Sequence, residues 1–109
     1  MYQYQAQVVS IYDGDTITLD IDLGCSIRLK GEKCRLFGIN TPEVRGPEKP
    51  EGLVARDALR AKILGKQITI KTYKDKTGKY GRLLVEVFSE DTNINEWLVA
   101  EGYGVTASY

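Results

Sequence analysis

The sequence lacks histidine altogether and contains only two cysteines among its 109 residues. Without histidine the commonest general base is absent, and neither a Ser-His triad nor a His-ligated metal site can be built. Cys25 and Cys34 do not have CxxC spacing, and no histidine is present to complete a zinc set. Any chemistry must therefore use carboxylates, arginine, lysine, tyrosine or a metal.

Long apolar runs are also missing. No stretch approaches the ~18 consecutive apolar residues of a membrane span, and the first ten residues show no secretory signal. We expect no membrane contact, and a cytoplasmic protein unless the chain is processed. We expect Cys25 and Cys34 to be buried thiols in a reducing compartment, with a disulfide across neighbouring strands as the alternative. The length predicts one domain, residues 1–109, and no apolar stripe demands a dimer, so a monomer is expected.

The charges sum to zero but are unevenly distributed along the chain. Residues 56–82 carry nine basic and two acidic side chains, whereas residues 83–109 carry five acidic and no basic ones. A basic middle segment is consistent with an anionic ligand. The alternative is a solvated charged face that acidic residues elsewhere offset.

Alternating apolar and polar residues predict a mainly β protein. The segment TITLDIDL, residues 16–23, places its apolar side chains on one face and its polar ones on the other, as in a half-buried antiparallel strand. Further strands are expected over residues 6–11, 33–39, 66–73 and 82–89. Residues 26–30 repeat the alternation, a turn is expected at Gly31-Glu32, and residues 43–52 are expected to form a surface loop.

Two helices complete the predicted fold. Apolar residues at helical spacing, followed by Gly65 as a natural C-cap, predict a helix over residues 53–64. A short second helix over residues 95–102 begins with Asn93 or Asn95 as its N-cap. A helix between the third and fourth strands and another after the fifth favour a five-stranded Greek-key barrel of the oligonucleotide-binding type, the OB-fold.

The segment CRLFGINTPEVRG, residues 34–46, joins an apolar run to charges at its two ends. In a strand, Arg35, Phe37 and Ile39 lie on the same face, so the Arg35 guanidinium is expected to point toward a largely enclosed face. A buried arginine needs an anionic partner, either an internal carboxylate or a bound ligand. Arg35 and Glu43 are therefore either a structural ion pair or parts of one site.

Charged residues gather in two further turns. Asp13 and Asp15 flank a glycine in YDGDT, where the local alternative is a simple Asx-type hairpin turn. The segment KYGR, residues 79–82, could equally be a solvated loop. Each turn taken alone has an ordinary structural explanation.

Taken together, the strings YDGDT, RLFGINTPE, KYGR and NEWLVAEGYG resemble the staphylococcal nuclease family, the calcium-dependent thermonucleases, in the same order and with similar spacing. The resemblance runs from about Val8 to Val105. One such string alone is weak evidence, but four in register argue against chance agreement. The resemblance implies a nuclease that cleaves DNA and RNA, with single strands preferred, and leaves 3′-phosphate ends.

The resemblance also implies roles for individual residues. Asp15, Asn40 and the Thr41 carbonyl would bind Ca²⁺, Glu43 would be the general base or orient the attacking water, Arg35 and Arg82 would grip the phosphate, and Lys79 and Tyr80 would contact a neighbouring phosphate. These roles agree with elementary chemistry, because a hard cation and two guanidiniums can neutralise the charge that develops during phosphodiester hydrolysis without any histidine.

One residue departs from the family pattern. Asn40 stands where an aspartate is usual, and its amide oxygen can still ligate calcium but carries no negative charge, so weaker metal affinity is expected. The alternative function is a non-catalytic module that binds nucleic acid or protein, because barrels of this fold also serve in binding. The presence of Arg35, Glu43 and Arg82 favours the nuclease.

Overall fold

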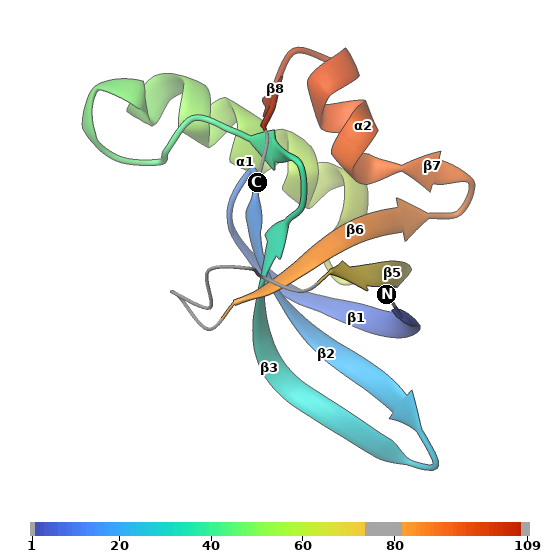
Figure 1. The fold of residues 1–109 in the computed structure, drawn as a ribbon. Helices are drawn as coiled ribbons and strands as arrows, with labels where there is room; N and C mark the ends of the chain where they lie inside the picture. Colours follow the sequence, from blue (N-terminus) through green and yellow to red (C-terminus); the bar gives the residue numbers. More distant parts are fainter. Residues whose placement is uncertain (1, 74–81, 108–109) are drawn as a thin grey trace.

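The computed structural model describes residues 2–73 and 82–107. Five long strands form its body (Figure 1): β1 (Tyr2–Asp13), β2 (Thr16–Gly24), β3 (Ile27–Leu36), β5 (Gln67–Tyr73) and β6 (Leu83–Ser89). Their order is β3-β2-β1-β5-β6, with neighbours antiparallel. A parallel pairing of β3 with β6 closes the ring. The predicted five-stranded barrel is therefore confirmed.

Short elements and two helices complete the chain. These are β4 (Ile39–Asn40), the 3-10 helix η1 (Gly46–Glu48), α1 (Lys49–Ile63), β7 (Thr92–Asn93), α2 (Ile94–Ala100) and β8 (Val105–Thr106). Figure 1 shows α1 and α2 together at one end of the barrel, while the β2–β3 hairpin projects from the other end. In the described parts of the chain, no helix is long and apolar enough to cross a membrane.

The core follows the predicted alternation. Ile17, Leu19 and Ile21 of β2 are buried in one cluster with side chains of the other strands, and Leu59 of α1 and Leu98 of α2 close that cluster. The predicted cap of the second helix is also confirmed, because the Asn93 side chain accepts a hydrogen bond from the Glu96 N–H.

The predicted turn at Gly31-Glu32 is wrong, because β3 continues through it. Leu19 of β2 pairs with Glu32 and Ile21 pairs with Leu29, so one residue of β2 faces two residues of β3. This is a β-bulge, and Gly31 supplies its positive φ of 66°. The strand then ends at Leu36, three residues earlier than predicted, at a turn that contains Gly38.

Two more local expectations need correction. The first helix begins at Lys49 rather than at residue 53, because Pro47 and Pro50 fit the first turns of η1 and α1, where no backbone N–H donor is needed. The cysteines are both free, as expected, but only Cys34 is buried. Cys25 is exposed because it lies in the turn of the projecting hairpin, beyond the core.

Candidate active site

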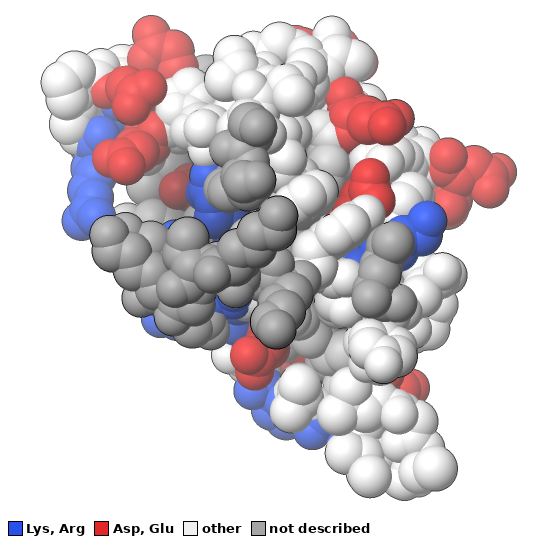
Figure 2. Space-filling view, viewed as in Figure 1, with Lys and Arg blue, Asp and Glu red and all other residues white. Residues whose placement is uncertain are grey.

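A cleft of about 1020 Å³ opens between the polar face of β1–β3, the loop after β4 and α1. Its charged lining contains six basic side chains, Lys33, Arg35, Arg45, Arg56, Arg60 and Arg82, and four acidic ones, Asp13, Asp15, Glu43 and Glu48. Figure 2 shows acidic side chains over α2 and β7, outside this lining. Arg56, Arg60 and Arg82 come from the basic middle segment, and the excess of basic side chains in the lining favours an anionic ligand.

Arg35 forms the central contact of the cleft. Its Nη1 lies 2.9 Å from Asp15 Oδ2, and the two side chains are 18% and 7% exposed. Its Nη2 donates to the Asn40 side-chain oxygen and, at 3.4 Å, to the Ile39 carbonyl. Among the described residues Arg35 forms an ion pair with Asp15 and none with Glu43.

The turn between β1 and β2 supplies two buried carboxylates. The Asp15 N–H donates to Asp13 Oδ1 at 3.1 Å, as in the Asx-type turn that was the local alternative for this segment. Burial, with further contributions from the neighbouring Asp15, raises the pKa of Asp13 to about 6. Asp15 Oδ2 also accepts a hydrogen bond of 3.0 Å from the Thr41 N–H, which ties this turn to the segment after β4.

Close backbone packing fixes the segment that carries Glu43. A Cβ atom at Gly52, in the first turn of α1, would lie 1.9 Å from the Glu43 carbonyl oxygen. A Cβ at Gly14 would lie 2.7 Å from Thr41 Oγ1. Only glycine permits these two approaches, which place the Glu43 segment between the β1–β2 turn and the helix.

Hydrogen bonds from two polar side chains hold the remaining walls in place. Arg60 of α1 donates through Nε and Nη2 to the Ile11 carbonyl of β1, at 3.3 and 2.9 Å. The buried Asn95 side chain accepts from the Val87 N–H and donates to the Phe37 carbonyl, so it joins α2 to β6 and to the turn after β3. Hydrogen bonds of this kind, which link separate elements, favour one arrangement of the cleft.

Most of the residues singled out from the sequence meet in this cleft. Six of them line it: Asp15, Arg35, Asn40, Thr41, Glu43 and Arg82. Lys79 and Tyr80 lie outside the described residues. The sequence pointed to Asp13 only as part of the charged YDGDT turn, without a role in the site. It did not single out the cleft-lining Lys33, Arg45, Arg56 and Arg60, and for Arg56 and Arg60 the only available signal was the excess of basic residues after residue 55.

The resemblance to known proteins agrees with this geometry. A family model described as staphylococcal nuclease homologue matches residues 33–109. The chain belongs to the staphylococcal nuclease family. Residues 34–43, which carry Arg35 and Glu43, and the segment around Arg82 all fall within the match.

Relatives of this family member come from several bacteria. It is similar to an uncharacterized protein of Bacillus anthracis, with 33% identity covering 94% of this chain and 47% of that protein. It is 30% identical to the thermonuclease of Staphylococcus hyicus, over 88% of this chain and 55% of that protein. The match to endonuclease YhcR of Bacillus subtilis is 32% identical and covers 95% of this chain but 9% of that protein. The chain thus spans about half the length, or less, of these relatives.

The cleft has a donor set that suits a hard divalent cation. Asp13 and Asp15 offer carboxylates, Asn40 an amide oxygen and Thr41 a main-chain carbonyl, and calcium prefers such oxygen ligands. The buried Thr41 Oγ1 has no hydrogen-bond partner in the described structure. A bound cation would also reduce the electrostatic repulsion between the buried carboxylates of Asp13 and Asp15. Within the described residues no three His, Cys, Asp or Glu side chains cluster, so neutral oxygens must complete any such site.

Proposed function

We propose that this chain is a calcium-dependent nuclease that hydrolyses phosphodiester bonds of DNA and RNA and leaves 3′-phosphate ends. One observation carries the proposal: a single cleft holds Arg35, Arg82 and the exposed carboxylate of Glu43. Two guanidiniums and a nearby carboxylate are the groups that phosphate binding and water activation require. The family membership supports the same reaction class.

Arg35 and Arg82 bind the reacting phosphate. A guanidinium presents two parallel N–H donors to two phosphate oxygens, and these bonds strengthen as negative charge develops in the transition state. Asp15 and Asn40 hold the Arg35 guanidinium in a fixed orientation, which reduces the reorganisation needed when substrate binds.

Glu43 takes a proton from the attacking water. Its side chain is exposed at the cleft, where water has access to the carboxylate. As a general base it takes the proton of the water whose oxygen attacks phosphorus. The bond to the 5′-oxygen breaks, that oxygen takes a proton from solvent to become a hydroxyl, and the phosphate remains on the 3′ end. The close packing of Gly52 against the Glu43 carbonyl holds the base in position.

Asp15, Asn40 and the Thr41 carbonyl would hold Ca²⁺, and Asp13 adds a second carboxylate beside them. The bound cation supplies further positive charge for the phosphate oxygens. Because Asn40 is neutral, the site has one negative charge fewer than a site with two ligating carboxylates from these positions, and we expect it to bind calcium more weakly.

A nuclease assay tests the proposed function. Purified protein is incubated with denatured DNA, native DNA and RNA, with calcium, with magnesium or with a chelator, and product ends are tested for release of phosphate by a phosphatase. We expect cleavage of denatured DNA with calcium, loss of cleavage with chelator, and 3′-phosphate ends. Binding without cleavage under every condition would instead favour a non-catalytic binding module.

A further inference from the structure

The cleft continues past Arg35 along the polar face of β3. Lys33 and Arg35 are two residues apart, so both side chains leave the same face of the strand, about 7 Å apart. Their partners across β2 are Thr18 and Thr16, whereas Cys34 between them is buried in the core. Lys33 and the two threonines line the cleft beside Arg35 and form a polar floor.

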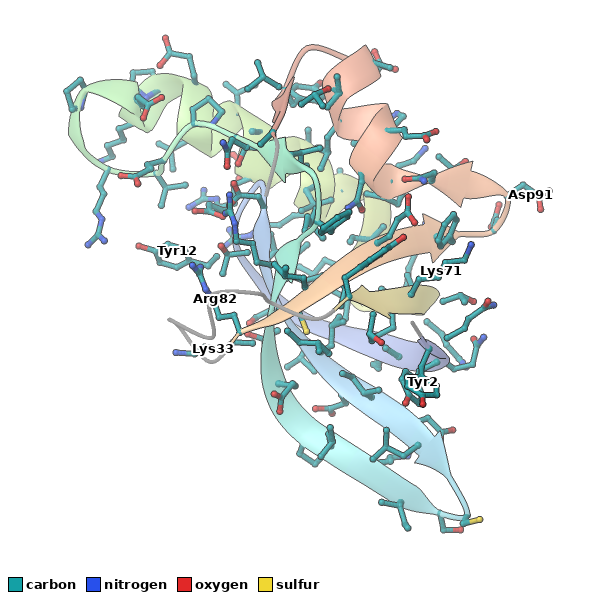
Figure 3. The ribbon with its side chains drawn as sticks, in the orientation of Figure 1. Tyr2, Tyr12, Lys33, Lys71, Arg82 and Asp91 are labelled. Carbon is teal, nitrogen blue, oxygen red and sulfur yellow. The ribbon has the colours of Figure 1, made fainter. Side chains whose placement is uncertain are left out.

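Lys33 also lies beside Arg82. In the parallel pairing of β3 with β6, Cys34 is opposite Leu83, which puts Arg82 level with Lys33. Both side chains line the cleft, and Figure 3 shows both at the same side of the molecule. Among the described residues Lys33 forms no ion pair, so no carboxylate there neutralises its charge. A second anionic group next to the one held by Arg82 would meet this ammonium.

A tyrosine stands at the same rim of the cleft. The pairing of β1 with β2 shifts between Ile11 and Asp13, which leaves Tyr12 as the extra residue of a β-bulge. Its two neighbours are buried, whereas the Tyr12 side chain is 54% exposed. It lines the cleft with Lys33, and Figure 3 shows it on the same side as Arg82 and Lys33. The bulge therefore turns an aromatic ring outward in the same cleft that Lys33, Arg35 and Arg82 line.

We infer that Tyr12 and Lys33 form a nucleotide subsite beside the reacting phosphate. A base of a single-stranded nucleic acid stacks on the Tyr12 ring, and the Lys33 ammonium binds the phosphate adjacent to the one held by Arg35 and Arg82. The inference rests on the proposed function. Because every base has a π-face, the subsite adds affinity without sequence preference, and it favours single strands, whose bases are free to leave their neighbours.

Binding of a fluorescently labelled oligothymidylate, measured by anisotropy with chelator present to prevent cleavage, tests the subsite. Tyr12→Ala should weaken binding about tenfold, whereas Tyr12→Phe should bind like the parent because the ring remains. Tyr12→Leu, which keeps an apolar side chain without the ring, should behave like Tyr12→Ala. Lys33→Gln should lower the slope of log K against log salt by about 0.7, the loss of one phosphate contact on a single strand.

Two variants on the same strands serve as matched controls. Tyr2→Ala changes an exposed tyrosine of β1, and Lys30→Gln an exposed lysine of β3, both outside the cleft. Both should bind like the parent. If the parent binds and cleaves while Tyr12→Ala, Tyr12→Leu and Lys33→Gln bind as it does, the subsite is overturned and the proposed function stands. If the parent neither binds nor cleaves any nucleic acid, both are overturned.

Discussion

The two ends of the β2–β3 hairpin carry the same kind of contact in different surroundings. At the cleft, Arg35 and Asp15 are 2.9 Å apart, with side chains 18% and 7% exposed. Toward the projecting tip, Lys30 and Asp20 are 3.5 Å apart, with side chains 73% and 21% exposed. The first pair has further partners in Asn40 and the Thr41 N–H. In the second pair Asp20 accepts one further hydrogen bond, from the Gly31 N–H, and the Lys30 side chain is largely exposed.

The two ion pairs differ in role because one is exposed and the other is buried. An exposed pair contributes little, because water and salt screen it and long side chains must be ordered. A buried pair is costly to break, because its loss leaves a charge without its partner, even though the intact pair adds little net stability. At the cleft, the pair therefore fixes geometry, and it aligns Arg35 with the segment that leads to Glu43.

The largest expected effect comes from removing the partner of Arg35. Asp15→Ala removes the carboxylate that forms the ion pair with Arg35 and accepts from the Thr41 N–H, and it should lower the free energy of unfolding by about 3 kcal/mol or more. Lys30→Gln, at the other end of the hairpin, should leave the urea midpoint nearly unchanged. Urea denaturation of both variants makes the comparison. Equal shifts would show that burial does not distinguish the two pairs.

Two glycines extend the comparison to the backbone. Gly52→Ala should lower the free energy of unfolding by about 1–3 kcal/mol, because the new methyl group meets the Glu43 carbonyl and the backbone must move. It should also reduce nuclease activity by displacing Glu43. Gly31→Asn in the hairpin should have little effect, because asparagine tolerates positive φ and the space is open. A Gly52→Ala protein with full stability and activity would contradict this account.

The two regions should also respond to pH in opposite directions. Between the ordinary pKa of 3.8 and the folded value of about 6, folded Asp13 holds a proton that the unfolded chain has released. The contribution of Asp13 to the free energy of unfolding therefore falls as the pH rises from about 4 to about 6. The Gly31 N–H lowers the pKa of Asp20, so its contribution is present above the ordinary pKa and is lost as the pH falls.

Thermal melts of each variant and of the parent, with chelator present and from about pH 3 to about pH 7, measure these differences in stability. The stability of Asp13→Asn relative to the parent should rise as the pH goes from about 4 to about 6. Asp20→Asn should be less stable than the parent at neutral pH, with a gap that closes in acid. Parallel curves for Asp13→Asn and the parent would show that Asp13 titrates normally in the folded protein.

The smallest effect is expected from a substitution beside the cleft end of the hairpin, Asn40→Asp. Asn40→Asp adds a carboxylate next to Arg35 and Asp15, so the calcium concentration for half-maximal activity should fall, by roughly tenfold or less. The rate at saturating calcium should change little. Calorimetric titration with calcium measures the affinity directly, and equal affinities in both forms would remove Asn40 from the metal site.

Local patterns in the sequence predicted much of the fold. The alternation in residues 16–23 gave β2 because its apolar set faces one core, and Asn93 was predictable as a cap because its side chain satisfies a free N–H of the next helix. Gly31 was misassigned to a turn because a bulge and a turn both need positive φ, and only the register of the pairing distinguishes them.

The candidate site was predictable only as far as its residues lie in family motifs. Arg35, Glu43 and Arg82 stand in such motifs, and the structure brings them to one cleft. The approach of Gly52 to Glu43 and the outward turn of Tyr12 depend on tertiary packing and on a bulge, and neither leaves a local pattern. That Asp15 is the partner of Arg35 likewise emerged only from the pairing of strands.

We propose that Glu43 prepares the attacking water for the phosphate that Arg35 and Arg82 hold. Glu43→Gln keeps the size of the side chain but cannot accept a proton, and Glu48→Gln changes another glutamate that lines the same cleft. The decisive measurement is the rate of oligonucleotide cleavage with saturating calcium, together with oligonucleotide binding, for both variants. If Glu43 is the general base, Glu43→Gln should lower the cleavage rate by about 10²- to 10⁴-fold while oligonucleotide binding is retained. Glu48→Gln should cleave at a nearly normal rate. An unchanged rate for Glu43→Gln would contradict this role of Glu43.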